Sequence, residues 1–280
     1  MSETKGGLSV CIPVYNKAAL LGRTLESIRR QNIAHLEVVA VNNGSMDDSL
    51  KVLESWRDRL NLKIFSLSKT ISAPEKWLLA LSLGTEKFLK LQLADDPILD
   101  GALTALLAVL HHEPTVGLAC GNSLPIDDRG EIIRTGVLHD YWSSINRTRA
   151  EFAAARNLRE KGACLARMRI GSSMFGDANS TVFRASLLPY LRQGINNLST
   201  SFQTWPEYEI NLRLFAVAEA RHLDIPVSHF SYDSDNHLKK SATATSAAAR
   251  TTFPPSTSSP SSCSIPTCVR SSGPPGKYSS

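Results

Sequence analysis

The stretch that decides the fold covers residues 8–45 and reads LSVCIPVYNKAALLGRTLESIRRQNIAHLEVVAVNNGS. Its first part, residues 8–15 (LSVCIPVY), is apolar and rich in β-branched side chains, which predicts a buried strand. Residues 35–41 (HLEVVAV) predict a second strand, which ends at a polar Asn-Asn-Gly-Ser turn. Between the two runs, apolar side chains recur at the spacing of one helix face, namely Ala18, Leu21, Leu25 and Ile28. This order predicts parallel strands joined by a helix.

The same alternation continues along the chain. Further strands are predicted at residues 62–67, 87–94, 116–120, 180–184 and 226–232. Further helices are predicted at residues 74–83, 100–112, 186–191 and 207–219. Ser45, followed by Asp48, resembles a capping box that opens another helix, through about residue 59. The predicted fold class is α/β, with a Rossmann-like, mostly parallel sheet flanked by helices.

Composition separates the end of the chain from the rest. The chain has 280 residues, of which 42% are hydrophobic and 20% charged, enough for one or two globular units. From residue 239 onward there are five basic residues and no acidic ones, so the net charge of +5 belongs to this end. The preceding part is therefore electrically balanced and is not expected to bind nucleic acid. Residues 241–280, rich in Ser, Thr, Ala and Pro, are expected to form a disordered tail.

The lengths of the apolar stretches and the cysteine pattern indicate the expected compartment of the protein. The longest apolar stretches, such as residues 103–110, are far shorter than the roughly 20 residues that cross a bilayer. The N-terminus has no secretory apolar region, so we expect a soluble, cytoplasmic protein, with peripheral contact to the inner face of the membrane left open. The cysteines are odd in number and scattered, which predicts reduced thiols without disulfides or zinc, at Cys11, Cys120, Cys164, Cys263 and Cys268.

Residues 143–170 form a polar, arginine-rich segment. They are predicted to be helical and carry six arginines, among them Arg149. We expect these arginines to form a solvated helix face. Contact with a diphosphate or an anionic acceptor is the alternative.

Polar residues gather where the predicted strands end. The ends of three strands carry residues 13–16, residues 42–45 and the pair Asp95 and Asp96. In an open parallel sheet, ligands collect at the carboxyl ends of the strands. Adjacent carboxylates repel one another unless they are solvated or neutralised, so a divalent cation holding a diphosphate is one expectation and a solvated Asp-Asp-Pro turn is the other. The first turn carries no Gly-x-Gly-x-x-Gly, which disfavours an oxidoreductase of the dinucleotide-binding class.

Taken together, three motifs strongly resemble the family 2 glycosyltransferases of GT-A fold. They are residues 10–16 (VCIPVYN), 37–47 (EVVAVNNGSMD) and 91–96 (LQLADD). Residues 176–184 (GDANSTVFR) and 207–214 (EYEINLRL) look like the acceptor-side strand and the acidic-residue helix of that family. The resemblance implies one GT-A domain, with a nucleotide-sugar-binding half at residues 1–97 and an acceptor-binding half at residues 98–240.

The resemblance also implies a nucleotide-diphosphate sugar as donor, held through Mg2+ or Mn2+ at the end of the fourth strand. Asp95 matches the second carboxylate of the family's Asp-x-Asp motif, whereas Leu93 stands where the first would be. The metal ligands therefore stay open between Asp95 and Asp96. His237 matches a position that leads toward the donor phosphates and could complete the coordination, and a solvated loop histidine is the alternative.

The resemblance further implies which residues contact the nucleotide: Pro13, Tyr15, Asn16, Asn42, Asn43, Ser45 and Asp95. The family usually has Asp where Asn42 stands, contacting the nucleobase. An amide both donates and accepts hydrogen bonds, so base recognition is retained while the preferred base stays open.

Glu207 is the expected catalytic base. It matches the acidic residue of the family's Asp-x-Glu-x-x-x-Arg pattern, with Arg213 six residues on. An acceptor hydroxyl must lose a proton as it attacks the anomeric carbon, and a nearby carboxylate is the simplest acceptor of that proton. Thr204 and Glu207 would also form a capping box, a structural explanation that does not exclude the catalytic one. Glu209 is the alternative base, and Arg213 is expected to pair with an acidic neighbour.

These observations predict a metal-assisted glycosyltransferase for polysaccharide biosynthesis. It would move a sugar from a nucleotide diphosphate to a hydroxyl of a glycan or lipid-linked saccharide. The resemblance implies inversion at the anomeric carbon. Because Leu93, Asn42 and Glu207 depart from the family pattern, the alternative is a catalytically impaired module that binds nucleotide sugars.

Overall fold

The computed structural model describes residues 6–127, 129–166, 178–192 and 206–231. All of them belong to one compact unit, which spans Met1–Asp233. The expected tail at residues 241–280, together with Cys263 and Cys268, lies outside the described residues.

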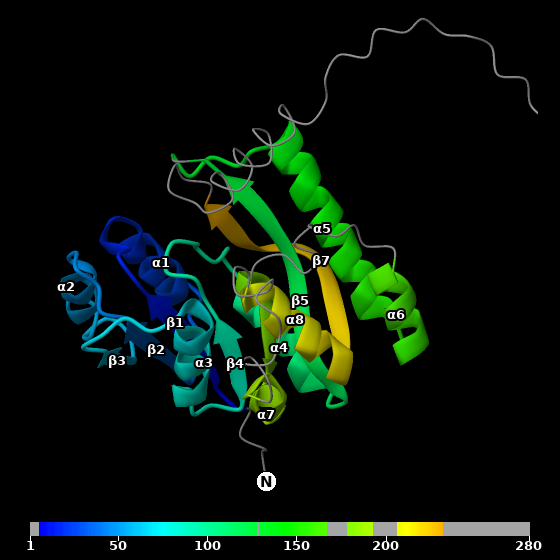
Figure 1. Ribbon diagram of the computed structural model, residues 1–280, viewed down its shortest axis with the longest axis horizontal. Coiled ribbons are helices and arrows are strands. Elements are labelled where there is room, and N and C mark those ends of the chain that lie inside the picture. Colours follow the sequence, from blue (N-terminus) through cyan, green and yellow to red (C-terminus); the bar gives the residue numbers. More distant parts are fainter. Residues whose placement is uncertain (1–5, 128, 167–177, 193–205, 232–280) are drawn as a thin grey trace, which may run out of the picture. The chain divides into compact units, whose positions relative to one another are not determined.

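A seven-stranded sheet, in the order β3-β2-β1-β4-β6-β5-β7, forms the centre of the described part (Figure 1). Its strands are β1 (Leu8–Val14), β2 (Leu36–Asn42), β3 (Leu62–Ser66), β4 (Phe88–Leu91), β5 (Val116–Ile126), β6 (Thr181–Arg184) and β7 (Glu219–Ser231). Strands β3, β2, β1 and β4 are all parallel. The short β6 runs antiparallel to both β4 and β5, and β5 is parallel to β7. The expected mostly parallel α/β sheet is confirmed.

Helices cover both faces of this sheet. They are α1 (Ala18–Arg30), α2 (Ser49–Glu54), α3 (Ala73–Leu83), α4 (Ala102–His112), α5 (Val137–Ala154), α6 (Leu158–Ala166), α7 (Leu188–Arg192) and α8 (Pro206–Val217). Short 3-10 turns lie at Ala178–Ser180 and Ala185–Leu187. No helix among these described elements is both long enough and apolar enough to cross a membrane.

Alternation along β1 produces two cores, because successive strand side chains point to opposite faces. Val10 and Ile12 pack into a core with α1 and α4, to which Leu25 belongs. Cys11, between them in sequence, packs into the other core together with Trp77 of α3. The alternating side chains of β1 therefore hold α1 and α4 on one face of the sheet and α3 on the other.

Two local expectations were wrong. Helix α2 begins at Ser49 with Asp48 as its N-cap and no side-chain cap bond, so Ser45 does not open it. The hydroxyl of Ser45 instead accepts a hydrogen bond from the backbone N–H of Asn16. Arg149 is fully buried rather than part of a solvated face, because its guanidinium donates to the carbonyl of Gly121 on β5. Burial of this charge is offset by hydrogen bonding to the strand backbone.

The three described cysteines, Cys11, Cys120 and Cys164, are buried, and none of the three is in a disulfide. Burial raises the pKa of the Cys11 thiol, and nearby Glu37 raises it further. Burial likewise raises the pKa of Cys120 to about 12. Both thiols are therefore protonated and unreactive at neutral pH.

Candidate functional site

The loops that follow β1 and β2 are bound to each other at the carboxyl end of the sheet. Asn16 has a left-handed backbone, with φ of 49°, a conformation that Asn tolerates better than most residues. Its side-chain oxygen accepts from the N–H of Met46 at 2.9 Å, and its own N–H donates to the hydroxyl of Ser45 at 3.1 Å. Asn16 and Ser45, both expected in the site, thus form one rigid loop pair.

Asp47 fixes the start of α1 against the same loop. One of its carboxylate oxygens accepts from the N–H of Ala18 at 2.9 Å, and the other accepts from the N–H and hydroxyl of Ser49. Burial would raise the pKa of Asp47, but the hydrogen bonds from Ser49 and Ala18 outweigh it and the pKa is lowered. Asp47 was quoted in the second motif but given no role. Its position just before α2 and opposite the start of α1 became visible only in the fold.

The two asparagines at the end of β2 have separate surroundings. The side chain of Asn43 exchanges two hydrogen bonds of 2.9 Å with the backbone of Ile71, so it fixes the loop before α3. Asn42 is 4% exposed and accepts from the N–H of Ser45 at 3.3 Å, while its amide lies 3.5 Å from the hydroxyl of Ser66. A separation of 3.5 Å is long for a hydrogen bond, so the amide of Asn42 is the less firmly held of the two.

Asp95 and Asp96 are neighbours with different environments. Asp96 is 2% exposed, and its two carboxylate oxygens accept from the amide of Asn179 and the N–H of Ser231, each at 2.7 Å. Asp95 has a side chain that is 20% exposed and forms an ion pair with Lys17, with Nζ 2.6 Å from Oδ2. The hydroxyl of Ser231 also donates to the backbone carbonyl of Asp95. Asp96 therefore links β4 to β7 and the 3-10 turn, while Asp95 faces the strand-end loops.

A second lysine and a tyrosine lie near this ion pair. The ammonium of Lys76, on α3, lies 5.5 Å from the ring centre of Tyr15, at cation–π distance. Burial lowers the pKa of Lys76, Asp95 raises it and Lys17 lowers it. The effects of Asp95 and Lys17 indicate that the three charged groups share one environment. Lys17 and Lys76 were not among the expected site residues, although Lys17 directly follows the first motif.

A divalent cation fits this arrangement only in part. Within the described ranges, no group of three or more His, Cys, Asp or Glu side chains could hold a metal ion. Both oxygens of Asp96 already accept hydrogen bonds, which leaves Asp95 as the better-placed carboxylate. Mg2+ is commonly held by one or two carboxylates together with substrate phosphates, so Asp95 fits a cation that arrives with a diphosphate. His237 lies outside the described residues.

The expected catalytic residue lies at the start of α8. Glu207 is the second residue of that helix, which the structure places at Pro206–Val217. Thr204 precedes the described part, so the expected capping box is not among the described contacts. On the same helix, the guanidinium of Arg213 donates to the carbonyl of Tyr190 at 3.4 Å.

A sequence model described as "Glycosyl transferase family 2" matches residues 9–173, more than half of the chain. This chain belongs to glycosyl transferase family 2. The matched residues include both strand-end loops and the Asp95–Asp96 pair.

Two curated relatives match short segments of the chain. A validoxylamine A glucosyltransferase of Streptomyces hygroscopicus subsp. jinggangensis is 50% identical over 58 residues, which are 20% of this chain and 14% of that protein. The poly(ribitol-phosphate) beta-N-acetylglucosaminyltransferase TarS of Staphylococcus aureus is 34% identical over 70 residues, 24% of this chain and 12% of TarS. The match therefore spans less than one sixth of either relative.

Solved structures confirm the GT-A fold over a longer stretch. S. aureus TarS in complex with UDP-GlcNAc has a TM-score of 0.57 and 18% identity, and the match covers 83% of this chain and 60% of that one. The mannosyltransferase PcManGT of Pyrobaculum calidifontis, in complex with GDP-Man and Mn2+, has a TM-score of 0.58 and 17% identity. That match covers 84% of this chain and 59% of PcManGT. At such identities the likeness concerns the fold alone.

Proposed function

We propose that this protein is a glycosyltransferase that takes a sugar from a nucleotide-diphosphate donor at the carboxyl ends of β1, β2 and β4. The observation that carries the proposal is the partly exposed Asp95, paired with Lys17 at the mouth of a GT-A sheet. Membership of glycosyl transferase family 2 supports it. The UDP, UDP-GlcNAc and GDP-Man bound by TarS and PcManGT support a nucleotide sugar as donor.

In this proposal, different residues of the chain bind different parts of the donor. Asn42 and the loop of Asn16 and Ser45 would contact the nucleoside, together with Pro13 and Tyr15, while Asn43 holds the loop before α3 in place. Lys17 and Lys76 supply positive charge for the diphosphate, since an ammonium group binds phosphate as a point charge. Residues 1–97 would then form the donor half, and residues 98–240 the acceptor half.

A divalent cation would be held by Asp95 and the donor's phosphates, and would neutralise charge on the leaving diphosphate. The Mn2+ in the PcManGT complex supports this assignment. Glu207, at the start of α8, is the proposed base that takes the proton from the acceptor hydroxyl. The proposed outcome is inversion, with a hydroxyl of a glycan or lipid-linked saccharide as acceptor.

The test combines a variant with a measurement of donor binding. Asp95→Asn removes the charge that holds the cation, so we expect Mn2+-dependent binding of UDP-GlcNAc or GDP-mannose to weaken by roughly tenfold or more. Calorimetry measures the binding, and release of UDP or GDP reports turnover. Asp58→Asn changes an exposed carboxylate of the α2–β3 connection and should leave the donor affinity unchanged.

The outcomes separate the alternatives. Donor binding without turnover, with any acceptor pool, would support the impaired-module alternative instead of the enzyme. A large loss of melting temperature in Asp95→Asn with donor affinity retained would contradict the assignment of Asp95. If no nucleoside-diphosphate sugar binds the wild-type protein, the proposed function is rejected.

A further inference from the structure

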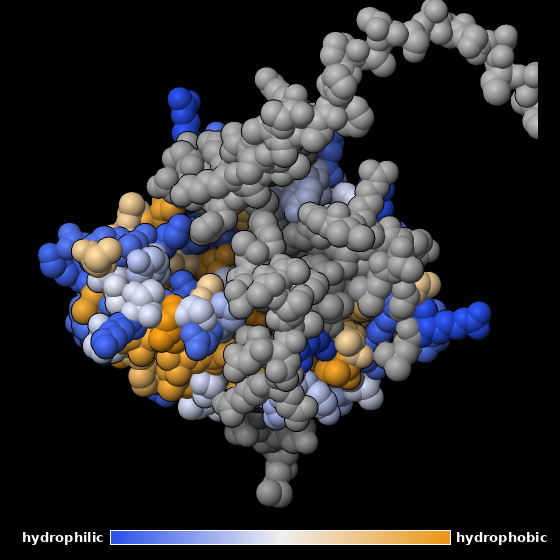
Figure 2. Space-filling model, in the orientation of Figure 1, coloured by the Kyte–Doolittle hydropathy of each residue, from blue (hydrophilic) through white to orange (hydrophobic). Residues whose placement is uncertain are grey.

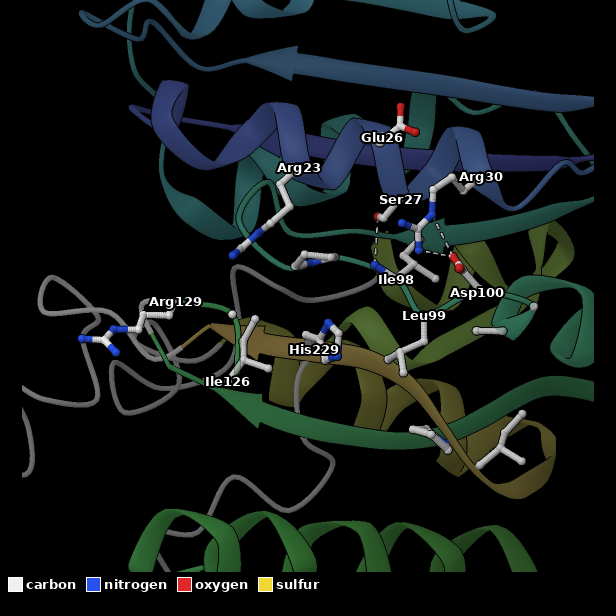
Figure 3. Close-up of a pocket in the computed structure, with 16 residues that line it drawn as sticks. Arg23, Glu26, Ser27, Arg30, Ile98, Leu99, Asp100, Ile126, Arg129 and His229 are labelled. Atoms are coloured by element: carbon white, nitrogen blue, oxygen red, sulfur yellow. Dashed lines mark hydrogen bonds and ion pairs between the residues drawn. The ribbon is translucent and has the colours of Figure 1, made fainter. Parts of the chain in front are cut away.

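A second hollow lies beside α1, away from the Lys17–Asp95 pair. Its volume is about 850 Å3, and it is lined by α1, by the segment from Pro97 to Ala102, by the turn after β5 and by β7 (Figure 3). Neither Lys17 nor Asp95 lines it. This volume lies within the roughly 300–1,000 Å3 that small-molecule sites occupy. We call this hollow the α1 groove.

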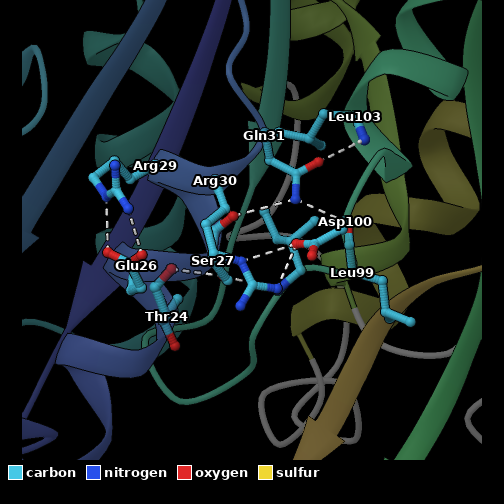
Figure 4. Close-up of polar contacts among 10 residues, drawn as sticks. Thr24, Glu26, Ser27, Arg29, Arg30, Gln31, Leu99, Asp100 and Leu103 are labelled. Carbon is cyan, nitrogen blue, oxygen red and sulfur yellow. Dashed lines mark hydrogen bonds and ion pairs between the residues drawn. The ribbon is translucent and has the colours of Figure 1, made fainter.

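The wall of the α1 groove is held from two sides. On one side, the hydroxyl of Ser27 accepts from the N–H of Ile98 at 2.9 Å (Figure 3), and Gln31 donates to the carbonyl of Leu99 at 2.9 Å (Figure 4). On the other side, the N–H of Leu99 donates to β7, and the N–H of His229 donates to the carbonyl of Pro97. These bonds leave the segment little freedom, so the groove is formed before any ligand arrives.

Charge in the α1 groove is not balanced. Arg30 is paired with Asp100, and Glu26 is paired with Arg29, so both acids that line the groove are already neutralised. The guanidinium of Arg23 instead donates to a neutral group, the hydroxyl of Ser231, at 3.2 Å. In the part of the chain that the structure describes, neither Arg23 nor Arg129 has a carboxylate partner.

The lowered pKa of His229 is consistent with this excess of positive charge in the groove. Its ring points into the groove in Figure 3, between Ile126 and Leu99. Burial lowers the pKa of His229, and the positive charge of Arg23 lowers it further. The imidazole is therefore neutral at pH 7, and it can donate or accept one hydrogen bond beside the guanidinium of Arg23.

We propose that the α1 groove binds a small ligand that carries a phosphate group, with Arg23 as the main phosphate-binding residue. Arginine presents a planar fork of N–H donors that matches phosphate oxygens. The uncharged part of the ligand would lie against Ile98, Ile126 and Pro226, the apolar lining. Arg129 also lines the groove, and its side chain points away from His229 in Figure 3, so it would reach the anion through a change of rotamer on binding.

Because neither Lys17 nor Asp95 lines the α1 groove, phosphate binding there can be tested apart from donor binding. The probes are inorganic phosphate and glucose 6-phosphate, titrated into the full chain at constant ionic strength with UDP and the diamagnetic Mg2+ present in excess. Calorimetry measures the affinity, and the ring signals of His229 in NMR spectra report where the probe binds. We expect both probes to bind and the His229 signals to shift.

Variants of arginines inside and outside the groove sharpen the test. Arg23→Met should weaken probe binding by roughly tenfold or more, because a hydrogen bond to a charged group is lost. Arg57→Met removes an exposed arginine that is paired with Glu54, and neither of these two residues lines the groove, so its affinity should stay within about twofold of the wild type. Arg129→Met, on an exposed turn, should also weaken binding and serves if Arg23→Met does not fold.

Three results would overturn the proposal. In the first, neither probe binds the wild-type protein. In the second, binding leaves the His229 signals unchanged. In the third, Arg23→Met and Arg57→Met weaken binding equally, which would show general attraction to positive charge instead of a site. None of these results depends on sugar transfer.

Discussion

The two ends of the parallel sheet each hold a carboxylate beside a lysine, in different surroundings. At the amino end, Glu37 is 2% exposed and accepts from Lys63, from the hydroxyl of Ser9 and twice from Thr85. At the carboxyl end, Asp95 is 20% exposed, and Lys17 is its one side-chain partner among the described residues. The same pair of charges is therefore built into the fold at one end and open to exchange at the other.

The comparison explains why only one end is a candidate for ligand binding. A carboxylate that accepts four hydrogen bonds and is almost fully buried has no free acceptor position for a substrate. Burying a carboxylate is costly unless each of its partners is present. Replacing Glu37 should therefore lower the free energy of unfolding. A partly exposed ion pair contributes little to stability and can be displaced by a stronger cation or anion. Each of the following variants acts on one end of the sheet.

The largest expected effect is on stability at the amino end. Glu37→Leu leaves the buried hydroxyl of Ser9 without its acceptor, and the ammonium of Lys63 and the hydroxyl of Thr85 lose theirs. We expect the free energy of unfolding to fall by roughly 3 kcal/mol or more. Urea unfolding at pH 7 measures it. A loss below 1 kcal/mol would mean that the two ends do not differ in the way described.

Glu37 should also make the free energy of unfolding depend on pH in the acidic range. Burial would raise the pKa of Glu37, but hydrogen bonds from Lys63, Ser9 and Thr85 outweigh it and lower the pKa from 4.5 to about 2. Because the folded pKa lies below the unfolded one, its stabilisation is complete above pH 4.5 and is lost as the pH falls toward 2. By pH 3, the contribution of ionised Glu37 to the free energy of unfolding should have fallen by about 2 kcal/mol.

The acid effect is measured as a difference between two proteins. Urea unfolding of the wild type and of Glu37→Leu is compared from pH 6 to pH 3. Carboxylates elsewhere, such as Asp47, titrate in both proteins and cancel in the difference. The gap in unfolding free energy should narrow as the pH falls. A gap that stays constant would show that Glu37 is not the titrating group.

The comparison also shows what the sequence could and could not predict. The strands and helices of the first half follow from alternating and helical apolar spacing, and the edge where the polar residues gather follows from parallel pairing. The different roles of Asp95 and Asp96 could not be predicted from the sequence. The partners of Asp96 are Asn179 and Ser231, which lie 83 and 135 residues away along the chain.

Other misses have similar physical causes. The four-residue β6 was predicted as a strand, but nothing in its sequence indicates that it inserts antiparallel between β4 and β5. Arg149 was expected on a solvated face because its helix is polar, yet one long side chain reaches across to β5. Ser45 was read as a cap from local spacing, whereas a loop 29 residues earlier in the chain uses its hydroxyl. In each case a long-range partner overrides the local pattern.

The smallest expected effect lies at the carboxyl end, where Lys17 and a divalent cation compete for Asp95. Lys17→Met removes the competing ammonium, so Mn2+ alone should bind roughly two- to fivefold more tightly, the scale of a partly exposed ion pair. The same variant should bind UDP more weakly without metal, because one positive charge near the diphosphate is gone. Manganese binding is followed by electron paramagnetic resonance. Lys51→Met, which breaks an exposed pair with Asp48, is the matched control and should change neither affinity. Weaker Mn2+ binding in Lys17→Met would mean that Lys17 supports the cation instead of competing with it, and that Asp95 resembles Glu37 as a fixed part of the fold.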